Sequence, residues 1–344
     1  MAKRNPIDGL EIDPATLQTV GKDLQRPECI LAERDGSLWS ADARGGVMHI
    51  TPDGSQHLVT QVANNSFQKA NDEETRFTEG TLPNGLAFAR NGDILISNFG
   101  TDRLERMTRT GGTSSVFDTI GGKAIGKVNF VLRDSHDRIW MTVSTRQKNW
   151  IDATRRRIVD GYIAVADDKG IRIVADGLSF TNEIRLDAAE EWLYVVESSA
   201  MKVTRFRMGA DASLSNRETF GPESHGAFVD GIAFDAFGNL WGTHVMTDRV
   251  FAITPDGDLR ILLDDDNGSP EGKALLAAFA QGETTADLMM ACGGTIAPWM
   301  ASITFGGPDL RNVYIGSLRG TNIPWFRSPV GGLPMIHWNE ERPS

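Results

Sequence analysis

The chain repeats one pattern of apolar and polar positions. In each copy a polar residue precedes a short apolar run, a turn rich in Asp, Asn and Gly follows, and a second apolar run carries Trp or Ile. Clear copies are ECILAERDGSLWSAD at 28–42, NGLAFARNGDILISN at 84–98 and DGIAFDAFGNLWGTH at 230–244. Apolar runs separated by such turns are typical of antiparallel β-hairpins.

Further copies begin at 129 and 182, and a more divergent one begins at 301, so successive starts lie 56, 45, 53, 48 and 71 residues apart. This period suits the four-stranded blades of a propeller. The sequence therefore predicts an all-β fold, a six-bladed β-propeller with four-stranded blades. We expect residues 1–344 to form a single propeller domain with an N-terminal arm at 1–14.

The two ends of the chain favour closure of the ring. Residues 15–22 have the pattern of a strand but precede the first copy, and only NIPWFRSP (322–329) and LPMIHW (333–338) follow the sixth. An N-terminal strand that completes the sixth blade would remove free sheet edges. We therefore predict that this strand closes the ring.

Three segments interrupt the repeat, at 62–80, 145–160 and 264–300. The last is rich in Ala, Leu and Met, which predicts a short helical insertion of one or two helices between blades five and six. Counting strands places all three insertions over the same face of the ring. Elaborated loops on one face of a rigid scaffold commonly carry function, so this face is the predicted active-site face.

Composition narrows the function classes. The 46 acidic and 35 basic residues give a net charge of −11, which disfavours a nucleic-acid partner. The two cysteines cannot build a disulfide framework and fit a reducing compartment. With no signal-peptide pattern and no run of 18 apolar residues, we expect a cytoplasmic protein without a membrane partner. The 36 glycines agree with many tight turns.

The polar residue that begins each copy is the candidate chemistry. Turn preferences would explain one such residue, but the symmetry of a propeller brings all of them to the mouth of the central channel. Their donor atoms are all oxygens, which favours a hard cation, and neutral amide carbonyls favour Ca²⁺. We predict one divalent metal, Ca²⁺ in preference, with Zn²⁺ or Mn²⁺ as alternatives. The residues are Glu28, Asn84, Asn129, Asn182 and Asp230.

The blade starts PECI (27–30), KVNFVLRDSHDRIW (127–140), FTNEIRLD (180–187) and VDGIAFDAFGNLW (229–241) resemble the senescence-marker-protein/gluconolactonase family of six-bladed propellers. The resemblance covers residues 20–320. It implies a hydrolase that opens sugar lactones and related esters, with Asp230 as the base. It also implies one divalent metal held by four residues, which are Glu28, Asn129, Asn182 and Asp230.

Two positions depart from the family pattern on the sugar side of the pocket. Phe130 follows Asn129 where the family commonly has Asp, and Lys127 stands where it commonly has Arg. With aromatic and Met side chains expected at the mouth, these changes predict a less polar substrate. Asn84 is expected to donate a hydrogen bond to the substrate, and Lys127 to contribute charge. The full set of predicted substrate contacts is Asn84, Lys127, Phe130, Trp150, Phe99 and Met246.

The sequence thus predicts a metal-dependent hydrolase of a small-molecule lactone or ester, in which the metal polarises the carbonyl and Asp230 activates water. Two alternatives stay open: the same site acting as a phosphotriesterase or in other non-lactone chemistry, and a non-catalytic propeller that binds a partner. His225 and His244 flank Asp230, and their part in catalysis is also open.

Overall fold

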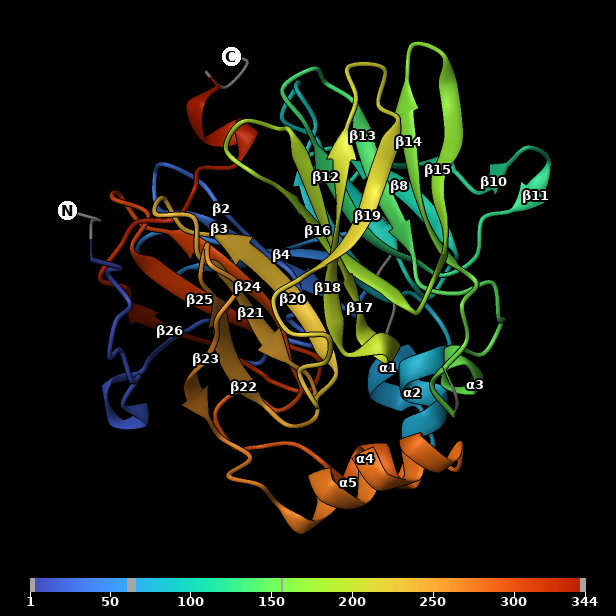
Figure 1. Ribbon diagram of the computed structural model, residues 1–344. Coiled ribbons are helices and arrows are strands. Elements are labelled where there is room, and N and C mark those ends of the chain that lie inside the picture. The colour runs from blue at the N-terminus through green and yellow to red at the C-terminus, as the bar shows by residue number, and fades with distance from the viewer. Residues whose placement is uncertain (1–3, 61–65, 156, 341–344) are drawn as a thin grey trace.

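The computed structural model describes residues 4–60, 66–155 and 157–340. Within them, the strands form six four-stranded antiparallel sheets arranged as a ring, together with the small hairpin β10–β11 (Figure 1). The predicted six-bladed propeller is confirmed. Blade one comprises β2 (Ile30–Ala32), β3 (Leu38–Asp42), β4 (Gly46–Ile50) and β5 (Gln56–Thr60). Blade two comprises β6 (Pro83–Phe88), β7 (Ile94–Asn98), β8 (Arg103–Met107) and β9 (Thr113–Phe117). Blade three comprises β12 (Val128–Arg133), β13 (Ile139–Val143), β14 (Gly161–Asp167) and β15 (Gly170–Leu178).

The hairpin β10 (Thr119–Ile120) and β11 (Lys123–Ala124) lies between blades two and three in the sequence. Blade four comprises β16 (Thr181–Leu186), β17 (Trp192–Glu197), β18 (Lys202–Met208) and β19 (Leu214–Phe220). Blade five comprises β20 (Val229–Phe234), β21 (Leu240–His244), β22 (Arg249–Ile253) and β23 (Leu259–Asp264). Blade six comprises β24 (Met300–Gly306), β25 (Asn312–Ser317), β26 (Ile323–Arg327) and β1 (Gln18–Val20). Apolar side chains on the facing sheets pack between neighbouring blades and form the core.

The sixth blade is closed by the N-terminal strand, as predicted. β1 pairs antiparallel with β26, so that Gln18 lies opposite Trp325 and Val20 opposite Ile323. β1 is only three residues long, yet it covers the edge that β26 would otherwise expose.

A carboxylate and a tryptophan recur together in the hairpin between the first two strands of three blades. In each, the indole N–H donates to the carboxylate six residues earlier, at 2.6–2.9 Å. Both groups are buried, so each satisfies the other. The pairs are Glu33 with Trp39, Asp134 with Trp140, and Asp235 with Trp241.

The insertions contribute helices that gather at one end of the ring, at the lower edge of Figure 1. The expected helices between blades five and six are α4 (Pro270–Gln281) and α5 (Ala286–Ala291). The other two insertions also contain helices, which the sequence did not indicate: α1 (Ser66–Lys69), α2 (Glu73–Thr78) and α3 (Trp150–Arg155). Residues 62–65 and 156 of the predicted insertions lie outside the described residues.

The C-terminal segment covers the opposite end of the ring, at the upper edge of Figure 1. Its 3-10 helix η3 (Ile336–Asn339) follows a bridge between Gly332 and Asp235, and the His337 ring lies 2.9 Å from the carbonyl of Ala32. Two further 3-10 turns are η1 (Pro14–Thr16) and η2 (Ser198–Ala200). In the part of the chain that the structure describes, no helix is long and apolar enough to cross a membrane.

Candidate active site at the helical mouth of the channel

The innermost strands of blades two to five each begin with a β-bulge, and each bulge contains one predicted site residue. The register of β12 shifts between Val128 and Phe130, at Asn129, and that of β20 shifts between Val229 and Ile232, at Asp230. Equivalent shifts place Asn84 in β6 and Asn182 in β16. A bulge leaves one residue unpaired and re-aims its side chain.

Hydroxyl groups of the preceding blade hold these bulges in place. Ser97 Oγ donates to the carbonyl of Asn129 at 2.7 Å, and Ser198 Oγ donates to that of Val229 at 2.6 Å. The backbone around each site residue is therefore fixed by the neighbouring blade, not by its own sheet alone.

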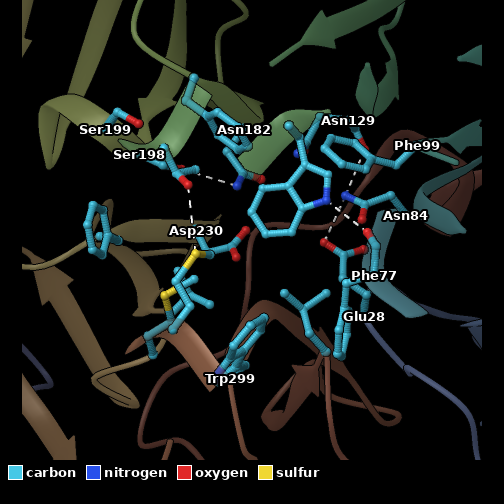
Figure 2. Close-up of a pocket in the computed structure, with 18 of the residues that line it drawn as sticks. Glu28, Phe77, Asn84, Phe99, Asn129, Asn182, Ser198, Ser199, Asp230 and Trp299 are labelled. Carbon is cyan, nitrogen blue, oxygen red and sulfur yellow. Dashed lines mark hydrogen bonds between the residues drawn. The ribbon is translucent and has the colours of Figure 1, made fainter. Parts of the chain in front are cut away.

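Five polar side chains face a common space at the channel mouth (Figure 2). Each is at most 5% exposed, and together they form the floor of a pocket. They are Glu28, Asn84, Asn129, Asn182 and Asp230. The structure thus brings together all five polar residues that begin the sequence repeats of blades one to five.

Three acceptor oxygens of this floor are buried without a partner among the described residues: Oε2 of Glu28, Oδ1 of Asn129 and Oδ1 of Asn182. Leaving such atoms unpaired costs about 1–3 kcal/mol each, more for a charged group. All three are oxygens, and a divalent cation would satisfy them together with the Asp230 carboxylate. The donor set therefore fits a hard metal ion.

Asn84 has a different place in the floor. Its amide nitrogen donates to Glu28 Oε1 at 3.1 Å and to the carbonyl of Asn129 at 3.0 Å, and its oxygen accepts from Arg26 at 2.6 Å. Because both N–H groups are engaged, this geometry does not support the expected hydrogen bond from Asn84 to a substrate. Instead, Asn84 orients Glu28.

Arg26 is a site residue that the sequence reasoning missed. It is 6% exposed, has a positive φ of 57°, and also donates to the carbonyl of Pro83 at 2.8 Å. It is the sole cationic side chain among the described residues that line the pocket. Its position two residues before Glu28 could have indicated from the sequence that it belongs to the site.

Burial sets the protonation of the carboxylates. It raises the pKa of Asp230 to about 7, where the negative charge of Glu183 adds to the rise and Arg26 and a hydrogen bond from Asn182 oppose it. Burial also raises the pKa of Glu28 well above its usual range, and Arg26 again opposes the rise. Without a cation, both carboxyl groups therefore bind protons more readily than usual, and a metal would compete with those protons.

Glu183 was also missed by the sequence reasoning. It follows Asn182 on β16, is fully buried, and lies 2.9 Å from Arg185, and burial raises the pKa of Glu183 to about 7. The sequence NEIR (182–185) could have indicated this residue, because two charged residues flank an apolar one on an inner strand.

Two of the predicted substrate contacts do not lie in the pocket lining. Lys127 pairs with Asp102 at 2.9 Å and lies 3.4 Å from the carbonyl of Phe99. Phe130 is fully buried, with its ring 4.6 Å from the Arg185 guanidinium carbon. For both residues the expected substrate contact is not supported by the geometry. The other four, Asn84, Phe99, Trp150 and Met246, do line the pocket.

The two histidines near Asp230 contact each other and not the pocket. His225 Nδ1 lies 3.0 Å from His244 Nε2, and neither ring is among the described pocket-lining residues. Burial lowers the pKa of His225 to about 4 and that of His244 well below its usual range. The pair is therefore neutral at pH 7 and packs within blade five against Phe251.

A second acidic cluster lies at the opposite mouth and differs from the pocket floor. It comprises Asp134, His136 and Glu190. Its carboxylates already accept hydrogen bonds: Asp134 from Arg138 and Trp140, and Glu190 from Ser135. No oxygen of this cluster is among the buried, unpartnered atoms of the described residues.

Comparison with known proteins shows that several solved structures are similar to this one. Among solved structures, a putative gluconolactonase is 16% identical, with 97% of this chain and 99% of that chain covered and a TM-score of 0.67. A gluconolactonase from Xanthomonas campestris is 16% identical, with coverages of 92% and 89% and a TM-score of 0.64. The calcium-binding protein regucalcin from Agrobacterium tumefaciens is 14% identical, with coverages of 92% and 96% and a TM-score of 0.61.

At these identities the structural likeness concerns the fold. No curated protein matches the chain. Residues 27–264 match the family described as the SMP-30/gluconolactonase/LRE-like region, and they span the first five blades, including the whole polar floor of the pocket. The chain therefore belongs to the SMP-30/gluconolactonase/LRE-like family.

Proposed function

We propose that the protein is a divalent-metal-dependent hydrolase that opens lactones or related esters. The observation that carries the proposal is the set of three buried, unpaired oxygens beside the Asp230 carboxylate, at the floor of a pocket. Family membership and gluconolactonase-like neighbours support the reaction class.

Four residues would hold the metal: Glu28, Asn129, Asn182 and Asp230. We favour Ca²⁺ because two of the four donors are neutral amide oxygens. The name of the regucalcin neighbour, a calcium-binding protein, points the same way. When bound, the cation supplies Lewis-acid polarisation of the ester carbonyl and stabilises the negative charge that develops there.

Asp230 is the proposed general base. Its carboxylate, which a bound metal would keep ionised, takes a proton from the attacking water. Asn182 donates a hydrogen bond to Asp230 and so helps to hold its orientation. Asn84 donates to Glu28 and so keeps it in place, and Arg26 holds Asn84 by donating to its amide oxygen. The apolar walls above exclude bulk water, which strengthens these electrostatic interactions.

The test is a lactone panel followed by pH-stat on protein stripped of metal and then restored with Ca²⁺, Mn²⁺ or Zn²⁺. We expect activity to disappear on chelation and to return with metal. Asp230→Asn should lower kcat by about 10²–10⁴-fold. Asp256→Asn, in an exposed turn of the same blade, is the matched control and should retain full activity.

Activity that survives chelation, or that is intact in Asp230→Asn, would overturn the mechanism. Calorimetric titration of the stripped protein with each metal gives an independent readout. If no divalent ion binds and no lactone is opened, a non-catalytic propeller that binds a partner becomes the better description.

A further inference from the structure

The walls above the polar floor are built mainly from aromatic rings. They come from the insertions and from the loops that begin or end the strands, so they converge from several blades (Figure 2). Aliphatic and Met side chains from α4, α5 and the blade ends fill the spaces between them. The aromatic residues are Phe77, Phe99, Trp150, Phe180, Phe228 and Trp299.

The rings contact one another and present carbon to the pocket. Trp150 lies edge-to-face with Phe99 and with Phe180, each at 6.2 Å between ring centroids. The Trp150 indole N–H donates to the carbonyl of Phe77 at 2.8 Å, and that of Trp299 donates to Cys292 at 3.0 Å. The single polar atom of each indole is therefore already occupied by the protein.

Few polar groups are present on these walls. The hydroxyls of Thr154 and Ser198 donate to backbone carbonyls, of Ile151 and Val229. Ser199 and Thr284 add two more hydroxyls, and Thr284 Oγ1 is buried with no hydrogen-bond partner among the described residues. Apart from Arg26, which donates to Asn84 of the floor and to the carbonyl of Pro83, the described lining above the floor contains no charged side chain and no amide side chain.

We infer that the substrate is a lactone or ester carrying an aryl or alkyl group, with at most two further hydrogen-bonding atoms, and not a sugar lactone. This inference rests on the proposed function of the floor. Each hydroxyl of a sugar would lose water without gaining a partner on these walls. An aryl or alkyl group would instead gain hydrophobic burial and contacts with the rings. The hydroxyl of Ser199 and that of Thr284, which has no partner among the described residues, account for the additional polar atoms.

The first test compares two substrates on the metal-restored enzyme, glucono-1,5-lactone and a phenyl-substituted δ-lactone. We expect kcat/KM to be about 100-fold or more higher for the phenyl lactone, because the hydroxyls of the sugar lactone would be left without hydrogen-bond partners in the pocket. Equal or faster opening of the sugar lactone would overturn the inference and leave the proposed function intact.

A binding measurement separates this inference from the reaction. The phenyl-substituted δ-lactam, which resists hydrolysis, and gluconolactam are titrated against tryptophan fluorescence, since Trp150 and Trp299 line the pocket. Binding of the phenyl lactam in preference supports apolar recognition, even if no lactone is opened and the proposed function fails. Absence of that preference overturns the inference.

A variant pair tests the wall itself. Met246 lines the pocket, and Gln is close to Met in shape but carries an amide. Met246→Gln should raise KM for the phenyl lactone by about 10-fold more than Met246→Leu does, with little difference in kcat between the two variants. Ile173→Gln, at an exposed apolar position on β15, is the control and should change neither constant. Equal KM values for the Gln and Leu variants would contradict the inference.

Discussion

The two mouths of the central channel both bury charged groups, but they differ in how these groups are paired. At the helical mouth, Glu28 and its neighbouring amides leave three acceptor oxygens without a donor among the described residues. At the opposite mouth, Arg133 donates to Glu340 at 2.9 Å and to Asp137 at 3.1 Å. Arg138 pairs there with Asp134.

This difference is the observation on which the proposed site rests. Burial and charge occur at both mouths, so neither distinguishes them. Paired groups stabilise the fold, whereas a buried acceptor without a partner costs stability and is retained where a ligand satisfies it. The helical mouth has the second property, and this separates it from the acidic cluster around Asp134.

The largest expected difference between the two mouths is in their contribution to the free energy of unfolding. Asp134→Ala removes the acceptor of the Trp140 indole, at 2.7 Å, and the partner of Arg138. We expect the free energy of unfolding to fall by about 3 kcal/mol, as for breaking a buried pair, with kcat/KM of the folded enzyme unchanged. Urea unfolding and pH-stat assays measure the two quantities.

Glu28→Gln is the matched change at the helical mouth. In metal-free protein it replaces a buried acid by an amide whose N–H can donate into a space lined by acceptors, so unfolding free energy should be equal or higher. Added Ca²⁺ should then stabilise the variant less than the parent protein. A destabilisation as large as that of Asp134→Ala, measured under chelation, would contradict the distinction between the mouths.

The next contrast is in pH dependence. The pKa of Asp230 is raised to about 7 from an ordinary value of 3.8, so between these values the folded, metal-free protein holds a proton that the unfolded chain has released. The contribution of Asp230 to stability therefore falls as pH rises through this window. The proposed Ca²⁺ would bind the ionised carboxylates, so the gain in Tm on adding Ca²⁺ should grow over the same window.

Thermal unfolding at pH 5, 6, 7 and 8, with chelator and with Ca²⁺, measures this effect. Each kcal/mol of unfolding free energy changes Tm by roughly 2–4 °C in a chain of 150–250 residues, and by somewhat less in a longer chain. Asp230→Asn should remove most of the pH dependence of the Ca²⁺ effect. An equal gain in Tm at pH 5 and pH 8 would show that protons and metal do not compete at this site.

The smallest expected effect is at the C-terminal segment. Glu340 is 30% exposed on its side chain, so its pair with Arg133 is partly screened by water. Glu340→Gln should lower the free energy of unfolding by about 1 kcal/mol or less and leave kcat and KM unchanged. A marked loss of activity would mean that the two mouths are coupled through the channel.

The ring and most of its polar floor could be predicted because the repeat defines a register. Once the blades are aligned, the first residue of each inner strand is known, and symmetry brings these residues together at the axis. This reasoning located Glu28, Asn129, Asn182 and Asp230, and the same insertions identified the face on which Phe99, Trp150 and Met246 lie.

The remaining residues depend on contacts that no local pattern contains. Lys127 is paired with Asp102 from the neighbouring blade, a contact set by the packing of two sheets. Phe130 was expected at the substrate because the family commonly has Asp at its position, but it follows the bulge at Asn129 and its side chain is fully buried. Arg26 lies before the first strand with a positive φ, outside the repeat altogether.

The seam between β1 and β26 has a consequence for how the chain is made. The strand that ends at Val20 leaves the ribosome early, but its partner Ile323 is synthesised only after the first five blades. During translation, those blades can assemble while β1 still lacks its partner strands β26, β25 and β24, and such an incomplete ring exposes backbone groups to other chains. Completion of the propeller is thus a late step that joins residues of very large sequence separation, which makes it slow. Chaperone protection of nascent chains would matter most in that interval.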